Sequence, residues 1–188
     1  MEPGIICCRH YASPLGGITL AAEADTDALC GLWFDGQKYF GNTAGARSAS
    51  PVRLPVFEEA CRWLDLYFSG RDPGFTPPLS LRTTPFRRAV WQELLAIPFG
   101  QTCSYAEIAR RIAARSGRAS MSAQAVGGAV GHNPVSLIIP CHRVVGSDGS
   151  LTGYAGGLDR KARLLRLERG EGFYSDPDRS QSVIARSA

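Results

Sequence analysis

The chain has 188 residues, 44% of them hydrophobic and 9% aromatic, which is the composition of a folded globular protein with one domain or two small ones. No stretch approaches the ~20 apolar residues needed to cross a bilayer, and the N-terminus lacks the basic start and apolar segment of a signal peptide. We therefore expect no membrane partner and a cytoplasmic protein, or a nuclear one in a eukaryote, whose six cysteines are reduced thiols.

The net charge of +4 is distributed unevenly along the chain. Residues 1–81 carry six basic and nine acidic side chains, whereas residues 82–172 carry thirteen basic and six acidic ones. All but one of the thirteen are arginines, which suit phosphate oxygens. This asymmetry suggests a polyanionic partner such as nucleic acid, although a solvated basic surface would have the same composition.

The first elements in chain order are short strands and one helix. Residues 10–22 read as two strands separated by the turn cluster Ser13-Pro14-Leu15-Gly16-Gly17, and residues 29–34 read as a third. Residues 41–55 predict a surface loop. Residues 56–68 carry apolar side chains at intervals of three and four, which predicts an amphipathic helix.

A proline-rich segment follows this helix. Its three prolines exclude a regular helix over residues 71–81 and indicate a linker between domains. We therefore expect an N-terminal domain over residues 1–81, a second domain over residues 82–172, and a polar, disordered tail over residues 173–188.

Helix-start signals organise the second domain. Thr84-Pro85 predicts the N-terminus of a helix that ends before Pro98. Ser104 and Glu107 form a capping-box pattern, and Ser122 can cap a further helix that runs through Gly131. Two short helices joined by a glycine-containing turn have the outline of a helix-turn-helix, whose second helix would enter a DNA groove.

The helix predicted over residues 123–131 contains three glycines, each of which costs about 1 kcal/mol relative to alanine inside a helix. They are Gly127, Gly128 and Gly131. Either a neighbouring element packs closely against them, or a nucleic-acid backbone approaches where a side chain would block it. The sequence leaves both explanations open.

The apolar run Leu137-Ile138-Ile139 leads through Pro140 to Cys141 and His142. A cysteine is a useful nucleophile only as a thiolate, so it needs a neighbour that takes its proton. Adjacent residues of an extended segment point to opposite faces, so His142 would act through a water molecule unless the backbone departs from strand geometry at Pro140. A cysteine after an apolar run is more often a small buried hydrophobe, so this pair alone does not establish catalysis.

The last predicted helix covers residues 158–169. Glu168 shares its apolar side with Leu164 and Leu165, and a carboxylate there is costly unless it is paired. It is either a solvated residue of a fraying helix end or the group that orients His142.

These motifs together resemble the O6-alkylguanine-DNA alkyltransferases, the methylated-DNA–protein-cysteine methyltransferases. The resemblance rests on Ile139-Pro140-Cys141-His142-Arg143-Val144, on Ala125-Val126-Gly127, on Asn133-Pro134 and on Gly153-Tyr154-Ala155-Gly156-Gly157. It is dense from about residue 84 to residue 168 and loose before that. It implies an α/β plus α fold, with a ribonuclease-H-like α/β domain followed by a winged helix-turn-helix-like, mainly helical domain.

The resemblance also implies a DNA-repair chemistry without a cofactor or metal. Cys141 would take the alkyl group from O6 of guanine, or more weakly from O4 of thymine, in double-stranded DNA, and each monomer would act once. His142 would deprotonate Cys141 through a water, Glu168 would fix His142, Tyr105 would give a proton to the departing base, and Asn133 would hold the preceding turn. The pocket would be walled by Val144, Tyr154 and Ala155, and DNA would be contacted by Tyr105, Gln124, Arg87, Gly131 and Ser147.

The sequence departs from the family pattern at Gln124, where many relatives have an arginine that replaces the flipped nucleotide in the base stack. Glutamine can fill that space but lacks the charge. Some relatives bind zinc through N-terminal Cys and His residues, whereas Cys7, Cys8, His10 and Cys30 lack a recognisable zinc spacing. A DNA-binding regulator with a sensory cysteine and a Cys-His hydrolase are the alternative functions.

Overall fold

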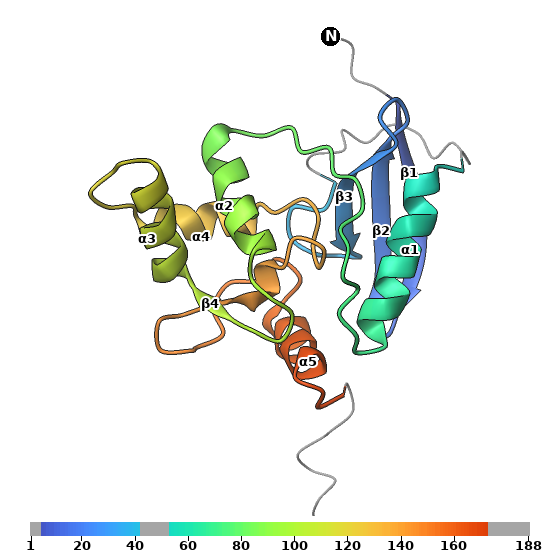
Figure 1. Cartoon of the computed structure of the whole chain (residues 1–188). Helices are drawn as coiled ribbons and strands as arrows, with labels where there is room; N and C mark the ends of the chain where they lie inside the picture. The colour runs from blue at the N-terminus through green and yellow to red at the C-terminus, as the bar shows by residue number, and fades with distance from the viewer. Residues whose placement is uncertain (1–4, 42–52, 173–188) are drawn as a thin grey trace, which may run out of the picture.

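The computed structural model describes residues 5–41 and 53–172. Its N-terminal half is built on a three-stranded antiparallel sheet (Figure 1). The strands are β1 (Ile6–Ser13), β2 (Gly16–Glu23) and β3 (Ala28–Phe34), in the order β1-β2-β3. Residues 14 and 15 join β1 to β2, which agrees with the predicted turn cluster. The N-terminal residues, most of the predicted loop over residues 41–55 and the predicted tail lie outside the described residues.

Helix α1 (Pro55–Phe68) lies along the sheet in Figure 1 and buries the apolar face that its periodicity predicts. Its buried residues are Val56, Phe57, Ala60, Trp63, Leu64 and Tyr67. The segment after α1 has no regular helix, as predicted. It nevertheless extends the sheet, because Leu29 of β3 donates to the Pro78 carbonyl and accepts from the Ser80 amide, both at 2.8 Å.

The second half is mainly helical. Its helices are α2 (Pro85–Leu95), α3 (Tyr105–Arg115), α4 (Ala123–Gly131) and α5 (Leu158–Glu168). The predicted caps are present: the side-chain oxygens of Thr84, Ser104 and Ser122 accept from the third amide beyond each of them. These contacts satisfy backbone donors that a helix start would otherwise leave unpaired.

The stretch that carries Cys141 is not a strand. It is irregular from Val135 to Pro140, with a left-handed φ of +69° at Leu137, and it then forms the single 3-10 turn η1 (Cys141–Arg143). Only β5 (Val144–Val145) is extended, and it pairs in parallel with β4 (Cys103–Ser104). The backbone thus leaves strand geometry before Pro140, yet neither ring nitrogen of His142 makes a hydrogen bond to Cys141 among the described residues.

The two halves meet along the outer edge of β3. The Leu32 amide donates to the Pro134 carbonyl, and the Ser136 amide donates to the Leu32 carbonyl, both at 2.9 Å. The loop that leads to Cys141 thus continues the pairing of the N-terminal sheet, which fixes its position through backbone contacts. No helix among the described residues is long and apolar enough to cross a membrane.

Candidate active site

Cys141 lies at the start of η1 with only 4% of its surface exposed. The Asn133 side-chain amide donates to Cys141 Sγ at 3.1 Å and to the Ile139 carbonyl at 2.7 Å, while its oxygen accepts from the Val135 amide at 3.0 Å. Burial raises the pKa of Cys141, against the hydrogen bond from Asn133, which lowers it. The thiol is therefore protonated at neutral pH and needs a base to react.

His142 is completely buried beside it. Its Nε2 lies 2.6 Å from Glu168 Oε1, whereas its Nδ1 has no hydrogen-bond partner among the described residues. Burial lowers the pKa of His142, so the ring is neutral, and the contact with a carboxylate assigns its single proton to Nε2. Nδ1 is then a free acceptor.

Glu168 accepts hydrogen bonds from four residues. Arg143 donates from Nε at 2.8 Å and from Nη2 at 3.1 Å, Tyr67 donates at 2.8 Å, and the Gly100 amide donates at 3.0 Å, in addition to His142. Burial opposes the charge, but the hydrogen bonds from His142 and Arg143 lower the pKa of Glu168 to about 2. The carboxylate is thus ionised and paired, and a fraying, solvated helix end is wrong.

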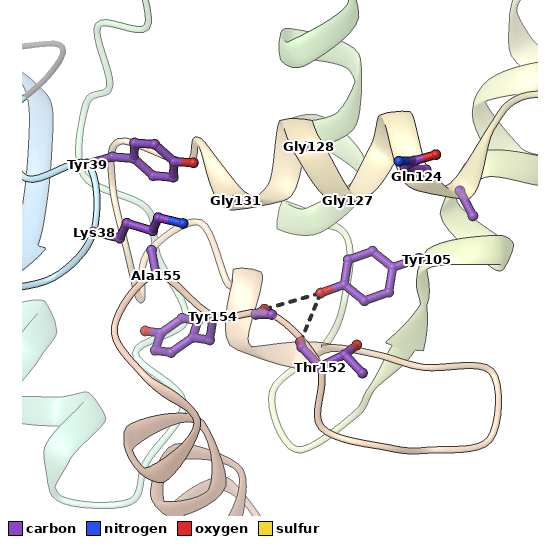
Figure 2. Close-up of a pocket in the computed structure, with 12 residues that line it drawn as sticks. Lys38, Tyr39, Tyr105, Gln124, Gly127, Gly128, Gly131, Thr152, Tyr154 and Ala155 are labelled. Atoms are coloured by element: carbon purple, nitrogen blue, oxygen red, sulfur yellow. Dashed lines mark hydrogen bonds between the residues drawn. The ribbon is translucent and has the colours of Figure 1, made fainter.

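A cleft of about 790 Å³ opens between α4 and the loop of residues 152–155. Figure 2 shows Tyr105 on one side of it, Lys38 and Tyr39 on the opposite side, and α4 above. The Tyr105 hydroxyl contacts the carbonyls of Thr152 and Gly153 at 3.2 and 3.3 Å. Burial raises the pKa of both Tyr105 and Tyr154. The Tyr154 ring meets the buried His142 ring edge-on, with centroids 6.5 Å apart, so the cleft adjoins the residue next to Cys141.

The structure brings most of the predicted site residues together. Tyr105, Gln124, Gly131, Tyr154 and Ala155 line the cleft, whereas Cys141, His142, Asn133 and Glu168 form the buried network beside it. Three predicted residues lie elsewhere. Val144 is buried in the pairing of β4 with β5, Ser147 is exposed in the turn after β5, and Arg87 lies in the first turn of α2 without lining the cleft.

The α4 glycines face the cleft. A Cβ added at Gly128 or Gly131 would meet no heavy atom within 4 Å, and one at Gly127 would meet only the Tyr105 ring, at 3.8 Å. Close packing against a neighbouring element is therefore wrong for Gly128 and Gly131. The open surface agrees with the other explanation, which requires room for the backbone of a nucleic acid.

Three side chains of this buried network were not predicted as site residues from the sequence. Tyr67 and Arg143 both hold Glu168, and Lys161 is a buried cation whose Nζ donates to the carbonyls of Val144 and Thr152 at 2.6 and 2.7 Å. Burial lowers the pKa of Lys161 to about 8. The sequence did carry a signal for Tyr67, which lies on the apolar face of the helix predicted over residues 56–68. A tyrosine hydroxyl on a face that becomes buried needs a hydrogen-bond partner.

The turn after β3 also joins the cleft. The Lys38 amide donates to the Ala155 carbonyl at 3.0 Å, and the Tyr39 ring stacks on His132 with centroids 4.4 Å apart. These contacts hold the backbone of this turn against the cleft, and the Lys38 side chain is one of the lining residues. No group of three or more His, Cys, Asp or Glu side chains in the described part of the chain could hold a metal ion.

Comparisons with known proteins match both halves of the chain. Residues 6–81 match the family model described as the ribonuclease-like domain of 6-O-methylguanine DNA methyltransferase, and residues 85–170 match its DNA binding domain. The chain belongs to the 6-O-methylguanine DNA methyltransferase family. The fold is accordingly a ribonuclease-like domain followed by a helical DNA-binding domain, as the sequence resemblance implied.

Individual members of the family are similar over nearly their whole length. The methylated-DNA–protein-cysteine methyltransferase of Mycolicibacterium paratuberculosis is 44% identical over 161 residues, covering 86% of this chain and 91% of the relative. The Haemophilus influenzae protein of the same name is 37% identical, covering 85% and 84%. The crystal structure of Mycobacterium tuberculosis OGT in complex with DNA has a TM-score of 0.74 and 38% identity, covering 88% of this chain and 94% of that one.

Proposed function

We propose that this protein repairs O6-methylguanine in DNA by transferring the methyl group irreversibly to its own Cys141. The observation that carries the proposal is the buried His142–Glu168 pair. His142 directly follows Cys141, and its Nδ1 has no hydrogen-bond partner in the described part of the chain. The names of its relatives, methylated-DNA–protein-cysteine methyltransferase, support the same reaction.

The transfer begins with the thiol proton. His142 Nδ1 takes it through a bridging water, and the resulting imidazolium is stabilised by the Glu168 carboxylate. Cys141 Sγ attacks the methyl carbon, the S–C bond forms, and the C–O6 bond breaks with its electrons moving onto guanine. Tyr105 gives a proton to the departing base and regains one from solvent, while the imidazolium of His142 releases the former thiol proton to solvent, so the net change is one proton moved from Cys141 to guanine.

The cleft is where the lesion enters. O6 of a paired guanine is inaccessible inside the duplex, so the nucleotide is flipped out, at a cost of a few kcal/mol that is smaller for a damaged base. Tyr154 and Ala155 contact the flipped base, while Gln124 at the start of α4 fills the space left in the stack. The DNA complex of the M. tuberculosis relative supports DNA as the partner.

The finer features of the substrate also belong to the proposal. The partner is double-stranded DNA, O4-methylthymine is a weaker substrate, and the protein acts as a monomer. A thioether is a very poor leaving group, so Cys141 is not regenerated and each molecule reacts once. Glu168, His142, Asn133 and Tyr105 act with Cys141, and Lys38 adds a positive charge at the rim of the cleft.

Intact-mass measurement after incubation with a duplex that contains O6-methylguanine tests the proposal. We expect one added methyl group per molecule, absent in Cys141→Ala and retained in the matched variant Cys103→Ala, which removes another buried thiol. Binding of the duplex without a mass change would favour a DNA-binding regulator. Release of product beyond one equivalent would favour a hydrolase.

A further inference from the structure

We propose that Tyr67 is a positioning residue for the transfer. Tyr67 belongs to the ribonuclease-like half, and its hydroxyl fixes the Glu168 carboxylate and the His142 ring relative to each other. The proposal rests on the proposed function, since it concerns the same proton transfer from Cys141. It assigns to the N-terminal half a role in positioning the base that the C-terminal half uses.

The three polar groups form a closed triangle. Tyr67 OH lies 2.8 Å from Glu168 Oε1 and 3.1 Å from His142 Nε2, and those two atoms are 2.6 Å apart. Glu168 is an ionised acceptor, so the single hydroxyl hydrogen of Tyr67 points to it. The Nε2–H group of His142 donates chiefly to Glu168 Oε1 at 2.6 Å, and the hydroxyl oxygen of Tyr67, at 3.1 Å, is a second acceptor for the same hydrogen, which restrains the plane of the imidazole.

The Tyr67 ring is held independently of its hydroxyl. It stacks on Trp63 with centroids 5.1 Å apart and planes at 9°, and it meets Phe99 edge-on at 5.9 Å. Phenylalanine would keep these contacts. The hydroxyl itself is completely buried and would be costly there without a partner, so its two contacts explain why this position is a tyrosine.

The hydroxyl also tunes the base. By donating to Glu168 Oε1 it withdraws negative charge from the atom that stabilises protonated His142. The groups that face His142 act in both directions: Glu168 raises its pKa, whereas burial and the cations Arg143 and Lys161 lower it. Cys141 precedes it in η1, and the Tyr154 ring lies edge-on at 6.5 Å. Loss of the Tyr67 hydroxyl should therefore raise the pKa of His142 and loosen its orientation.

The experiment measures single-turnover methyl transfer by Tyr67→Phe from a duplex with O6-methylguanine, across pH 5 to 9. Loss of one hydrogen bond to a charged group should slow transfer about tenfold at the plateau. The acid limb of the pH–rate profile follows the protonation of His142, the base that takes the proton of Cys141. Because the pKa of His142 rises, this limb should move to higher pH. Duplex affinity, measured in the Cys141→Ala background, should not change.

Tyr11→Phe is the matched control. Tyr11 also donates to a carboxylate, that of Asp65 in α1 at 2.7 Å, but Tyr11 is partly exposed and Asp65 is not a member of the His142–Glu168 network. It should leave both the rate and the profile unchanged. A thermal unfolding scan of each variant shows whether the fold is retained.

Two outcomes would overturn the proposal: a Tyr67→Phe rate within about twofold of the parent, or a uniform loss of rate with an unmoved acid limb, which indicates a structural role only. If Tyr67→Phe fails to fold, site-specific 3-fluorotyrosine at position 67 replaces it. This stronger donor should move the acid limb to lower pH, and an unmoved limb would again refute the proposal. Absence of transfer by the parent protein would refute the proposed function instead.

Discussion

At the scale of single residues, Glu168 determines the state of the site. It is a buried carboxylate that is kept ionised by Arg143, His142 and Tyr67, so the His142 proton stays on Nε2. Removing one partner of a buried ion pair usually costs 3–5 kcal/mol, because the other charge is left uncompensated. In this molecule Arg143 would be the stranded charge.

Glu168 also predicts an acid dependence of stability. Its pKa falls from an ordinary 4.5 to about 2 in the folded protein, so it contributes about 3 kcal/mol above pH 4.5 that is lost as the pH falls toward 2. Glu168→Gln should lower the free energy of unfolding at pH 7 by about that amount and should flatten its decrease below pH 4.5. Urea unfolding at pH 7, 4.5 and 3.5 measures both effects.

The control is Glu58→Gln, which removes the exposed carboxylate that pairs with Arg9. Exposed pairs contribute little, so the curve of this variant should follow that of the parent. Equal slopes for the parent and Glu168→Gln below pH 4.5 would contradict the ionised, paired state of Glu168.

Residue identities predicted part of this network. The Cys141-His142 motif and the position of Glu168 on an apolar helix face pointed to a relay, and the structure joins His142 to Glu168. Tyr67 and Gly100 were not predicted as partners, because Tyr67 is 101 residues from Glu168 and the Gly100 donor is a backbone amide. No local pattern encodes contacts of that range.

At the scale of elements, α4 carries the surface that meets DNA in the proposal. Its first turn presents Gln124, and its glycines leave the helix face open. The local rules predicted α1 to α5 well, since caps, prolines and periodicity act within a few residues. They did not predict η1, the β4–β5 pairing or the bridge between Leu79 and Leu29, which depend on segments distant in the sequence.

A charge at position 124 should strengthen binding. We expect Gln124→Arg to tighten the complex with alkylated duplex, because a guanidinium can fill the same space and add a contact to phosphate or base. One added phosphate contact should steepen the slope of log affinity against log salt by about 1. Fluorescence anisotropy between 50 and 200 mM salt measures it.

Gln92→Arg is the comparison, because it makes the same charge change on an exposed position of α2 away from the cleft. Its effect on the salt slope should be smaller. Identical slopes for the two variants would argue against a wedge role for Gln124.

At the scale of the whole molecule, the two halves share one structure. The loop before Cys141 pairs with β3, and Tyr67 of α1 reaches the network of α5 and η1. We propose that the boundary between the domains lies between residues 81 and 82. The proline-rich composition that marks this boundary could not predict how closely the halves are joined, because the joining contacts are long-range.

This joining predicts cooperative unfolding. Differential scanning calorimetry should give a single peak with a ratio of van't Hoff to calorimetric enthalpy close to about 1, because neither half keeps its core when the other unfolds. Two independent domains of similar size would give a ratio of about 0.5. Two resolved peaks would show that the β3 contacts do not couple the halves.

The burial of Cys141 has a consequence for how long its thiol survives before repair. If each molecule reacts once, as we propose, the repair capacity equals the number of molecules whose Cys141 is still unreacted when damage occurs. Oxidants and small electrophiles attack exposed thiolates, whereas this sulfur is 4% exposed and protonated at rest. In the proposed function, the Cys141 thiol therefore stays unreacted until a flipped, methylated base enters the cleft.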